Sequence, residues 1–479
     1  MSWLSISKKQ GIARGAMILA TAGIIVKIIG ACFKIPLGAI LKPEGMANFS
    51  IAYNIYALLF VLSTAGVPVA VSKMIAEARA TGRGHEVSRI YRLSLVAFAG
   101  VSLAASAGLF LGADMFARLM GSATAAPAIA AIAPAIFIVA ISSITRGYFQ
   151  GNLNMMPTAF SEVIEALGKM IIGLACAWWL DQSGFDASHV AAGAVVGVSA
   201  GAMLAAVYLQ IAKKREWEAA FSKHAPSRST REILKELMHL AIPITIGAAV
   251  ISLTNVIDSA LVMNLLQKIG FTARKAMWLY GSYNYAANLF NLPSVLITTI
   301  GVSLIPAVSG AFAQGARVRL CQTIESTMKL AMLMSFAASF GMSALAEPIV
   351  HLLYGGSIEA EAVRAAGFML RILALAVPAL SVVTLTNAIH QAVSNVRLPV
   401  ISMLAGAVVK LISNWVLVAT PGINISGAAV STILCYMTIA IINLEALRRL
   451  PNINISYAGV FVKPAIAGFD NRCRCAHVV

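Results

Sequence analysis

Several lysines of this sequence lie inside long apolar segments, where a charge is costly. Lys27 and Lys34 fall in the first apolar run, and Lys169 and Lys410 fall in later ones. A charge at the centre of a bilayer costs about 2.5 to 3.5 kcal/mol even on insertion scales, so such a group normally faces a bundle interior or a wet cavity. Lys27 and Lys34 are seven residues apart, and two helical turns place them on one face. Ammonium groups gathered in a cavity would bind an anion, and they hold phosphate as point charges.

The stretch RGYFQGNLNMMPTAFSEVIEALGKMIIG, residues 146–173, adds charges of both signs. Arg146 is predicted at the cytoplasmic mouth, where a topology signal is more common than a ligand. Glu165 and Lys169 are at i and i+4 of one helix, so they either neutralise each other or carry charge into a cavity. The predicted cationic, substrate-binding cavity therefore has these candidate residues: Lys27, Lys34, Arg146, Glu165, Lys169 and Lys410.

An acidic residue in the second half of the chain is a candidate for ion coupling. Asp258 follows Asn255 by three residues in SLTNVIDSALV, which places both on one helix face. We interpret the pair as a candidate site for a coupling Na⁺ or H⁺, with a hydrogen-bonded structural carboxylate as the alternative. The seven histidines and six cysteines are dispersed without metal or disulfide spacing, so we expect no catalytic residues, no metal and no other cofactor.

The elements that position these charges are membrane helices. The chain has 479 residues, of which 59% are hydrophobic and 11% charged, and its mean hydropathy is +0.83. Apolar runs of about 20 residues recur throughout, which is the length that crosses a bilayer as a helix. The sequence thus predicts an all-α polytopic membrane protein with twelve spans, near residues 12–40, 49–71, 91–112, 127–146, 158–180, 187–212, 237–263, 278–312, 328–353, 366–392, 398–419 and 423–446.

Basic residues set the expected orientation. With a cytoplasmic N-terminus, 22 Lys and Arg residues, Lys8 and Lys9 among them, fall in inside segments and 6 in outside segments. This asymmetry favours that orientation under the positive-inside rule. The net charge of +17 is dispersed among short loops, which indicates topology signals and contact with anionic membrane lipids and argues against a nucleic-acid partner.

The two halves of the chain share a pattern. Gln150 and Gln391 each end a span, and Lys169 and Lys410 each follow 19 residues later, so both pairs are offset by 241. We predict two parallel six-helix repeats, a transporter signature with substrate bound between the halves. The expected domains are a bundle over 1–212, a basic cytoplasmic linker over 213–236, a bundle over 237–446, and an incomplete thirteenth helix with a polar tail over 447–479.

Three stretches carry a family resemblance: VKIIGACFKIPLGAILKPEG, AYNIYALLFVLSTAGVPVAVSKMIAE and RGYFQGNLNMMPTAFSEVIEALGK. They resemble the polysaccharide-biosynthesis branch of the multidrug/oligosaccharidyl-lipid/polysaccharide (MOP) exporter superfamily, and most of all its stage V sporulation protein B and MurJ-like lipid II flippase group. The resemblance implies a V-shaped fold like that of MATE transporters, with fourteen spans, so helices 13 and 14 would be truncated here. By motif match, Lys27 and Lys34 stand where the MurJ-type family has cavity arginines, whereas Asn288 stands where MurJ proper has an arginine.

The implied function is a flippase of the bacterial plasma membrane. It would move an undecaprenyl-diphosphate-linked sugar, lipid II or a related cell-wall precursor, from the inner to the outer leaflet, coupled to Na⁺, H⁺ or membrane potential. Cell-wall synthesis proteins are its expected partners. One alternative is a multidrug or organic-cation exporter, which predicts an acidic cavity. Another is a membrane glycosyltransferase or polymerase, which would need catalytic carboxylates or histidines near a membrane face; their absence predicts that the protein is not an enzyme.

Overall fold

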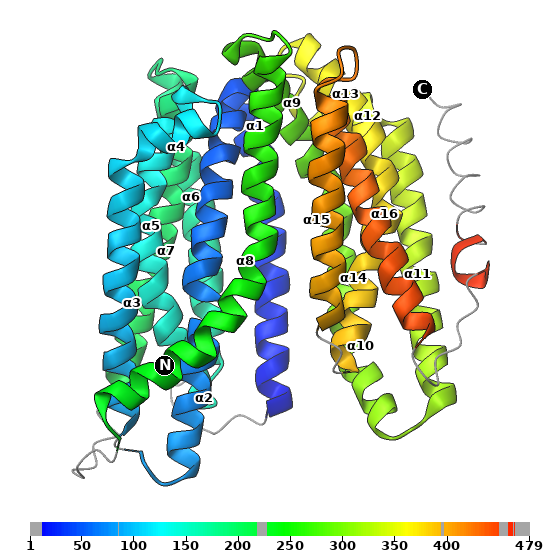
Figure 1. The fold of residues 1–479 in the computed structure, drawn as a ribbon. Coiled ribbons are helices and arrows are strands. Elements are labelled where there is room, and N and C mark those ends of the chain that lie inside the picture. Colours follow the sequence, from blue (N-terminus) through cyan, green and yellow to red (C-terminus); the bar gives the residue numbers. More distant parts are fainter. Residues whose placement is uncertain are drawn as a thin grey trace, which may run out of the picture. The chain divides into compact units, whose positions relative to one another are not determined.

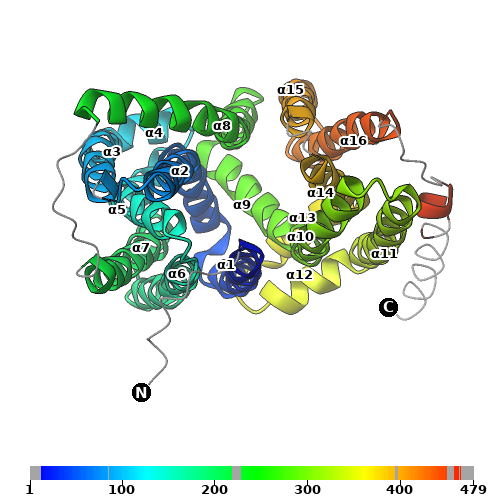
Figure 2. The same ribbon diagram turned by 90° about the horizontal axis from the view of Figure 1, so that it is seen from below.

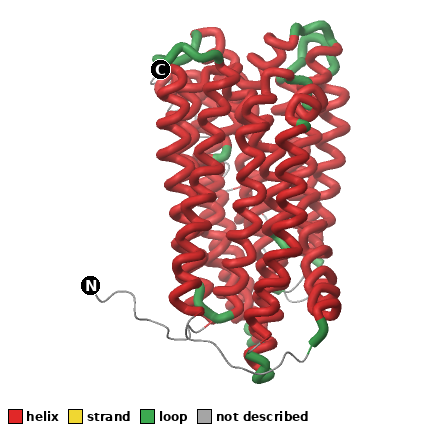
Figure 3. Tube along the Cα trace, turned by 90° about the vertical axis from the view of Figure 1, so that its left-hand side faces the viewer, coloured by secondary structure: helices red, strands yellow, loops and turns green. Residues whose placement is uncertain are grey.

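The computed structural model describes residues 12–84, 86–217, 228–393, 397–449, 458–462 and 464. These residues form helices and no β-strand (Figure 3). Eight of their helical segments are long and apolar enough to cross a membrane, or nine if one bent pair counts as a span. The prediction of an all-α, multi-pass membrane protein is therefore confirmed. Lys8, Lys9, part of the predicted linker and most of the predicted tail lie outside the described residues.

The chain divides into two compact units, and the first comprises residues 1–37 and 48–256. It contains most of α1 (Ile12–Thr64), the first part of α8 (Thr230–Lys268), and the elements α2 (Val67–Ala80), α3 (Glu86–Leu111), α4 (Ala113–Leu119), η1 (Ala123–Ala125), α5 (Ala126–Gly151), α6 (Met156–Gln182) and α7 (Ala187–Trp217). Within this unit α5 is central: it packs against α2, α3 and α7, while α6 packs against α7 (Figure 2). The sequence of α5 is apolar on nearly every side, as expected of a helix buried all round.

The second unit comprises residues 38–47 and 257–479. It contains the end of α8 and the elements α9 (Ala273–Phe290), α10 (Leu292–Ala313), α11 (Arg317–Ala344), α12 (Ala346–Tyr354), α13 (Ala360–Leu373), η2 (Ala374–Ala376), α14 (Val377–Ala392), α15 (Arg397–Val418), α16 (Ser426–Arg448) and η3 (Ala458–Val462). Here α14 is central and packs against α10, α11 and α16, and α15 packs against α16 (Figures 1 and 2). The buried side chains of α14, such as Val382 and Leu385, form an apolar core with Ile324 and Met328 of α11.

Helix breaks fall at three places that refine the predicted spans. The element α1 covers the first predicted span and most of the second, and it consists of two helices that meet in a kink at Lys42, whose φ of 56° and ψ of 174° lie outside the helical region and which precedes Pro43. The single span predicted over 278–312 was wrong, because α9 ends and α10 begins around Asn291, with Pro293 in the first turn, where its missing N–H costs nothing. The span predicted over 328–353 is a pair, α11 and α12, bent by 77°.

The division between the units falls inside α8, after Val256, rather than in the linker predicted over 213–236. The first turns of α8 belong to unit 1 because Ile233, Leu237 and Ala241 are buried in an apolar cluster with side chains of α2 and α3. Polar contacts between helices strengthen this attachment: Arg228, just before α8, lies 3.1 Å from Glu77 of α2, and Arg89 of α3 donates to Thr230 Oγ1 at 2.6 Å. Because one face of the start of α8 packs in unit 1, the boundary between the units lies within α8 and not in the polar linker.

Candidate functional site

The helices α6 and α7 of unit 1 approach each other closely through glycines. A Cβ atom at Gly201 would lie 2.4 Å from the Glu165 carbonyl oxygen and 2.6 Å from the Lys169 nitrogen, and one at Gly197 would lie 2.7 Å from the Lys169 carbonyl oxygen. Small residues four apart let membrane helices touch backbone to backbone. The backbone of α6 is thus fixed against α7 at Glu165 and Lys169, two of the predicted site residues.

A cavity of about 340 Å³ lies among α1, α5, α6 and α7 of unit 1. Three of the predicted site residues line it, Arg146, Glu165 and Lys169. The structure adds a carboxylate and aromatic rings that were not among the predicted site residues: Glu162, Tyr53, Tyr56 and Phe60. Spacings of three and four residues place Glu162, Glu165 and Lys169 on one face of α6. This spacing was the signal in the sequence that could have identified Glu162, whereas nothing in α1 marked its tyrosines.

Arg146 is held firmly in the cavity wall. Its side chain is buried, its Nη2 donates to Glu165 Oε2 at 2.7 Å, and its Nε donates to Ser161 Oγ at 2.9 Å. Ser161 Oγ in turn donates to the Thr158 carbonyl oxygen at 2.7 Å. Arg146 is therefore a buried cation rather than a surface anchor. Its partner is Glu165, the carboxylate that the helical spacing had suggested as a partner of Lys169.

Lys169 is left with aromatic neighbours. Its Nζ lies 5.7 Å from the ring centre of Phe33 and 5.6 Å from that of Tyr53. Cation–π contacts of this kind contribute about 0.5 to 2 kcal/mol, depending on desolvation. Among the side chains that the structure describes, no carboxylate forms an ion pair with Lys169. Its positive charge is thus placed in the cavity, where it also hydrogen-bonds to the Tyr53 hydroxyl, and the nearby charge of Lys34 adds to it.

The two lysines of α1 differ in position. Lys34 is half-buried and acts electrostatically on Lys169 and Tyr53, although it does not line the cavity itself. Lys27 is exposed at the surface of unit 1, and its neighbour Val26 lines the cavity instead. The structure therefore brings Lys34 close to the predicted site and does not bring Lys27 into this cavity.

Lys410 lies in unit 2, in an ion pair with Asp258. Lys410 Nζ is 2.8 Å from Asp258 Oδ2, and the two side chains are 14% and 12% exposed. Asn414 Nδ2 donates to the other carboxylate oxygen, Oδ1, and Ser431 Oγ donates to Asn414 Oδ1 at 2.5 Å. Both oxygens of Asp258 are therefore engaged, and the lysine ammonium occupies the position that a coupling cation would need. Asn255, three residues earlier on α8, is exposed.

The repeat predicted from the lysines has a structural counterpart. Lys169 is the fourteenth residue of α6, which begins at Met156, and Lys410 is the fourteenth residue of α15, which begins at Arg397. In both cases the preceding helix, α5 or α14, is the central helix of its unit. The two lysines thus have the same position along their helices, but their surroundings differ. The Lys169 ammonium lies over aromatic rings, and the Lys410 ammonium is neutralised by a carboxylate.

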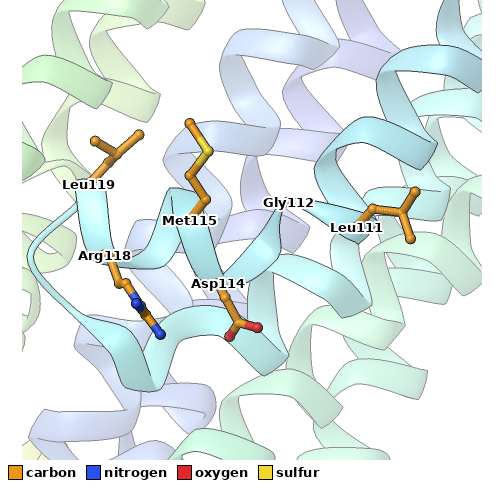
Figure 4. A pocket seen from close by; sticks show the side chains of 6 residues that line it. All are labelled: Leu111, Gly112, Asp114, Met115, Arg118 and Leu119. Atoms are coloured by element: carbon orange, nitrogen blue, oxygen red, sulfur yellow. The ribbon is translucent and has the colours of Figure 1, made fainter.

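A second depression, of about 570 Å³, lies at the end of α3 and on α4 (Figure 4). Its side chains belong to one short stretch of chain, and Asp114 and Arg118 point to one side while Met115 and Leu119 point to the other. Leu111 and Met115 are among its exposed members. Because no buried charge converges there, we assign the candidate site to the smaller cavity of unit 1. In the described part of the chain, no group of His, Cys, Asp or Glu side chains could hold a metal ion.

Comparison with known proteins places the chain in a family. The polysaccharide biosynthesis protein family matches residues 12–312, and the MatE family matches residues 243–416. Stage V sporulation protein B of Bacillus subtilis (strain 168) is 26% identical over 96% of this chain and 89% of its own length. The lipid II flippase MurJ of the same organism is 27% identical over 91% of this chain and 82% of its own length.

A solved structure supports the same assignment at the level of the fold. The lipid II flippase MurJ in an inward closed conformation superposes with a TM-score of 0.74, covering 96% of this chain and 93% of that structure at 15% identity. The arrangement of helices in this chain is therefore that of MurJ and of the MATE transporters. The chain belongs to the polysaccharide biosynthesis protein family and is a membrane transporter of the MOP superfamily.

Proposed function

We propose that this transporter flips an undecaprenyl-diphosphate-linked sugar, lipid II or a related cell-wall precursor, from the inner to the outer leaflet of the bacterial plasma membrane. The observation that carries the proposal is the position of Lys169 in the cavity of unit 1. Its ammonium lies over two aromatic rings with no carboxylate partner among the described side chains, while the neighbouring Arg146 is already paired with Glu165. The name of one relative, a lipid II flippase, supports the same class of cargo.

The energetics favour exchange of partners by Lys169. Leaving the rings of Phe33 and Tyr53 costs about 0.5 to 2 kcal/mol, and each hydrogen bond to a charged group contributes about 1.5 to 3 kcal/mol. Lys169 gives up one such bond, to the Tyr53 hydroxyl, and can gain two or three from phosphate oxygens. A diphosphate carries several oxygens that can accept from one ammonium, and Lys34 lies close enough to add its field. An anionic headgroup would therefore displace the aromatic contacts of Lys169. We place the N-terminus in the cytoplasm on the distribution of basic residues, so this cargo would be loaded from that side.

An organic-cation exporter is the second candidate, and two observations favour it. Glu162 and Glu165 line the same cavity as Lys169, and the MatE family matches residues 243–416. Such an exporter would need a carboxylate to bind its cargo, so replacing Glu162 by Gln would abolish export of the cation while Lys169→Ala would spare it. In a diphosphate flippase, by contrast, Lys169→Ala would abolish transport.

The test is lipid II accessibility at the outer face of cells depleted of their own flippases and expressing this chain. We expect the wild type to restore accessibility and Lys169→Ala to lose at least tenfold in rate, because the unpaired cation of the cavity is gone. Lys329→Ala is the matched control, since Lys329 forms an ion pair of 2.7 Å with Glu325 on α11 and is 45% exposed. Equal restoration by the Lys169→Ala and wild-type chains, at equal amounts in the membrane, would contradict the proposal.

A further inference from the structure

Glu162 lines the cavity of unit 1 and has no part in the proposed binding of a diphosphate by Lys169. It is half-buried and lies one helical turn before Glu165 on the same face of α6. Among the described side chains it forms no ion pair, whereas Glu165 is paired with Arg146 at 2.7 Å. A carboxylate that borders a cavity and has no fixed counter-ion can bind a proton or release it.

The charged and titratable groups around Glu162 come from several helices. Helix α1 contributes Tyr53 and Tyr56, α5 contributes Arg146, and α6 contributes Glu165 and Lys169, while α7 contributes the apolar Val198. Arg146 brings a positive charge to this cavity and Glu165 a negative one, and the two are 2.7 Å apart. The opposing fields come from the two members of one ion pair and so partly cancel at Glu162.

Protonation of Glu162 changes the net charge of the cavity. With Glu162 ionised, the charges of Arg146 and Lys169 balance those of the two glutamates, and the formal sum of the lining residues is zero. With Glu162 neutral, the sum is +1. An anion entering the cavity therefore meets a neutral site in one state and a positive site in the other.

The carboxylate predicted for ion coupling is less suited to this role. Both oxygens of Asp258 are engaged, one by the Lys410 ammonium at 2.8 Å and the other by the Asn414 amide. Removing a counter-ion from a buried charge costs several kcal/mol, so an exchangeable proton or cation would have to displace Lys410 first. Glu162 faces the cavity, and no such displacement is needed there.

We propose that Glu162 is a proton-binding site that sets the charge of the cavity, accepting a proton when the anionic headgroup binds and returning it to water when the headgroup leaves. This inference rests on the proposed function, because it assumes a diphosphate as cargo. Linkage makes the effect reciprocal: if the anion raises proton occupancy at Glu162, a proton at Glu162 raises the affinity for the anion by the same factor. No covalent bond to the cargo is formed or broken.

The test measures binding of farnesyl diphosphate to the full chain in detergent from pH 5.5 to 8.5. We expect wild-type affinity to fall as the pH rises, and Glu162→Gln to bind roughly tenfold more tightly than wild type at high pH, within the range typical of coupled sites. In weakly buffered solution, wild type should take up more protons on binding than Glu162→Gln. Glu162→Asp keeps a titratable group and should keep the pH dependence. Glu445→Gln, at a surface ion pair with Arg449, is the control.

The outcomes separate this inference from the proposed function. If Lys169→Ala binds farnesyl diphosphate as well as wild type does, the proposed function is wrong. If Lys169→Ala abolishes binding while Glu162→Gln shows the pH dependence and proton uptake of wild type, the proton site is overturned and the function stands. If Glu162→Gln does not fold, retention of proton uptake by Glu162→Asp supports the site and its loss opposes it.

Discussion

Replacing Lys410 by Met should destabilise the protein far more than removing an exposed ion pair of equal length. At 2.8 Å, two unit charges attract by about 6 kcal/mol in an effective dielectric of about 20. Desolvation of the two ions, several kcal/mol for each, offsets most of that attraction, so the intact pair stabilises the fold little relative to an apolar pair. Removal of one partner leaves the other charge buried and uncompensated, and the expected loss is about 3 to 5 kcal/mol.

The assay is equilibrium unfolding of the purified protein in detergent. Lys410→Met and Asp258→Leu should each lose about 3 to 5 kcal/mol, and the double variant should recover most of that loss because no charge remains buried. The control is Lys329→Met, which removes a pair of 2.7 Å whose lysine and glutamate side chains are 45% and 25% exposed. Its expected loss is about 1 kcal/mol or less, as is usual for surface pairs. The reasoning is refuted if Lys410→Met loses no more than Lys329→Met, or if the losses of the two single variants add in the double variant.

Two further predictions concern packing in unit 1. Gly201→Leu should cost about 1 to 3 kcal/mol and displace α6, because a Cβ there would lie 2.4 Å from a backbone oxygen, whereas Gly100→Leu, with no atom within 4 Å of its Cβ, should be nearly neutral in the same unfolding assay. Arg228→Ala should speed amide hydrogen exchange in the first turns of α8, since it removes the 3.1 Å pair that joins this end of the helix to Glu77 of α2. Exchange unchanged from wild type would contradict that attachment, and Arg449→Ala, at an exposed i, i+4 pair, is its control.

The sequence determined the class of fold, because the physics behind that prediction is local. Apolar runs of about 20 residues can only be membrane helices in a chain of this composition. The equal spacing of Gln150 and Lys169, and of Gln391 and Lys410, predicted corresponding positions for the two lysines, and in the structure each is the fourteenth residue of its helix. The breaks in the helices were harder to predict. The run over residues 278–312 held signals of the break that the single predicted span did not use: α9 contains Asn284 and Asn288 and is less apolar than α10, and Pro293 follows Asn291 at the break.

Only the tertiary structure decided which charges neutralise one another. Helical spacing indicated an ion pair between Glu165 and Lys169. In the structure Glu165 pairs instead with Arg146, 19 residues earlier on α5. The ion pair between Asp258 and Lys410 joins helices 152 residues apart in sequence. A helical period fixes which residues share a face, yet it says nothing of what lies opposite that face. The partner across the face determines whether a cation inside the bundle is neutralised by a carboxylate, like Lys410, or lies against aromatic side chains, like Lys169.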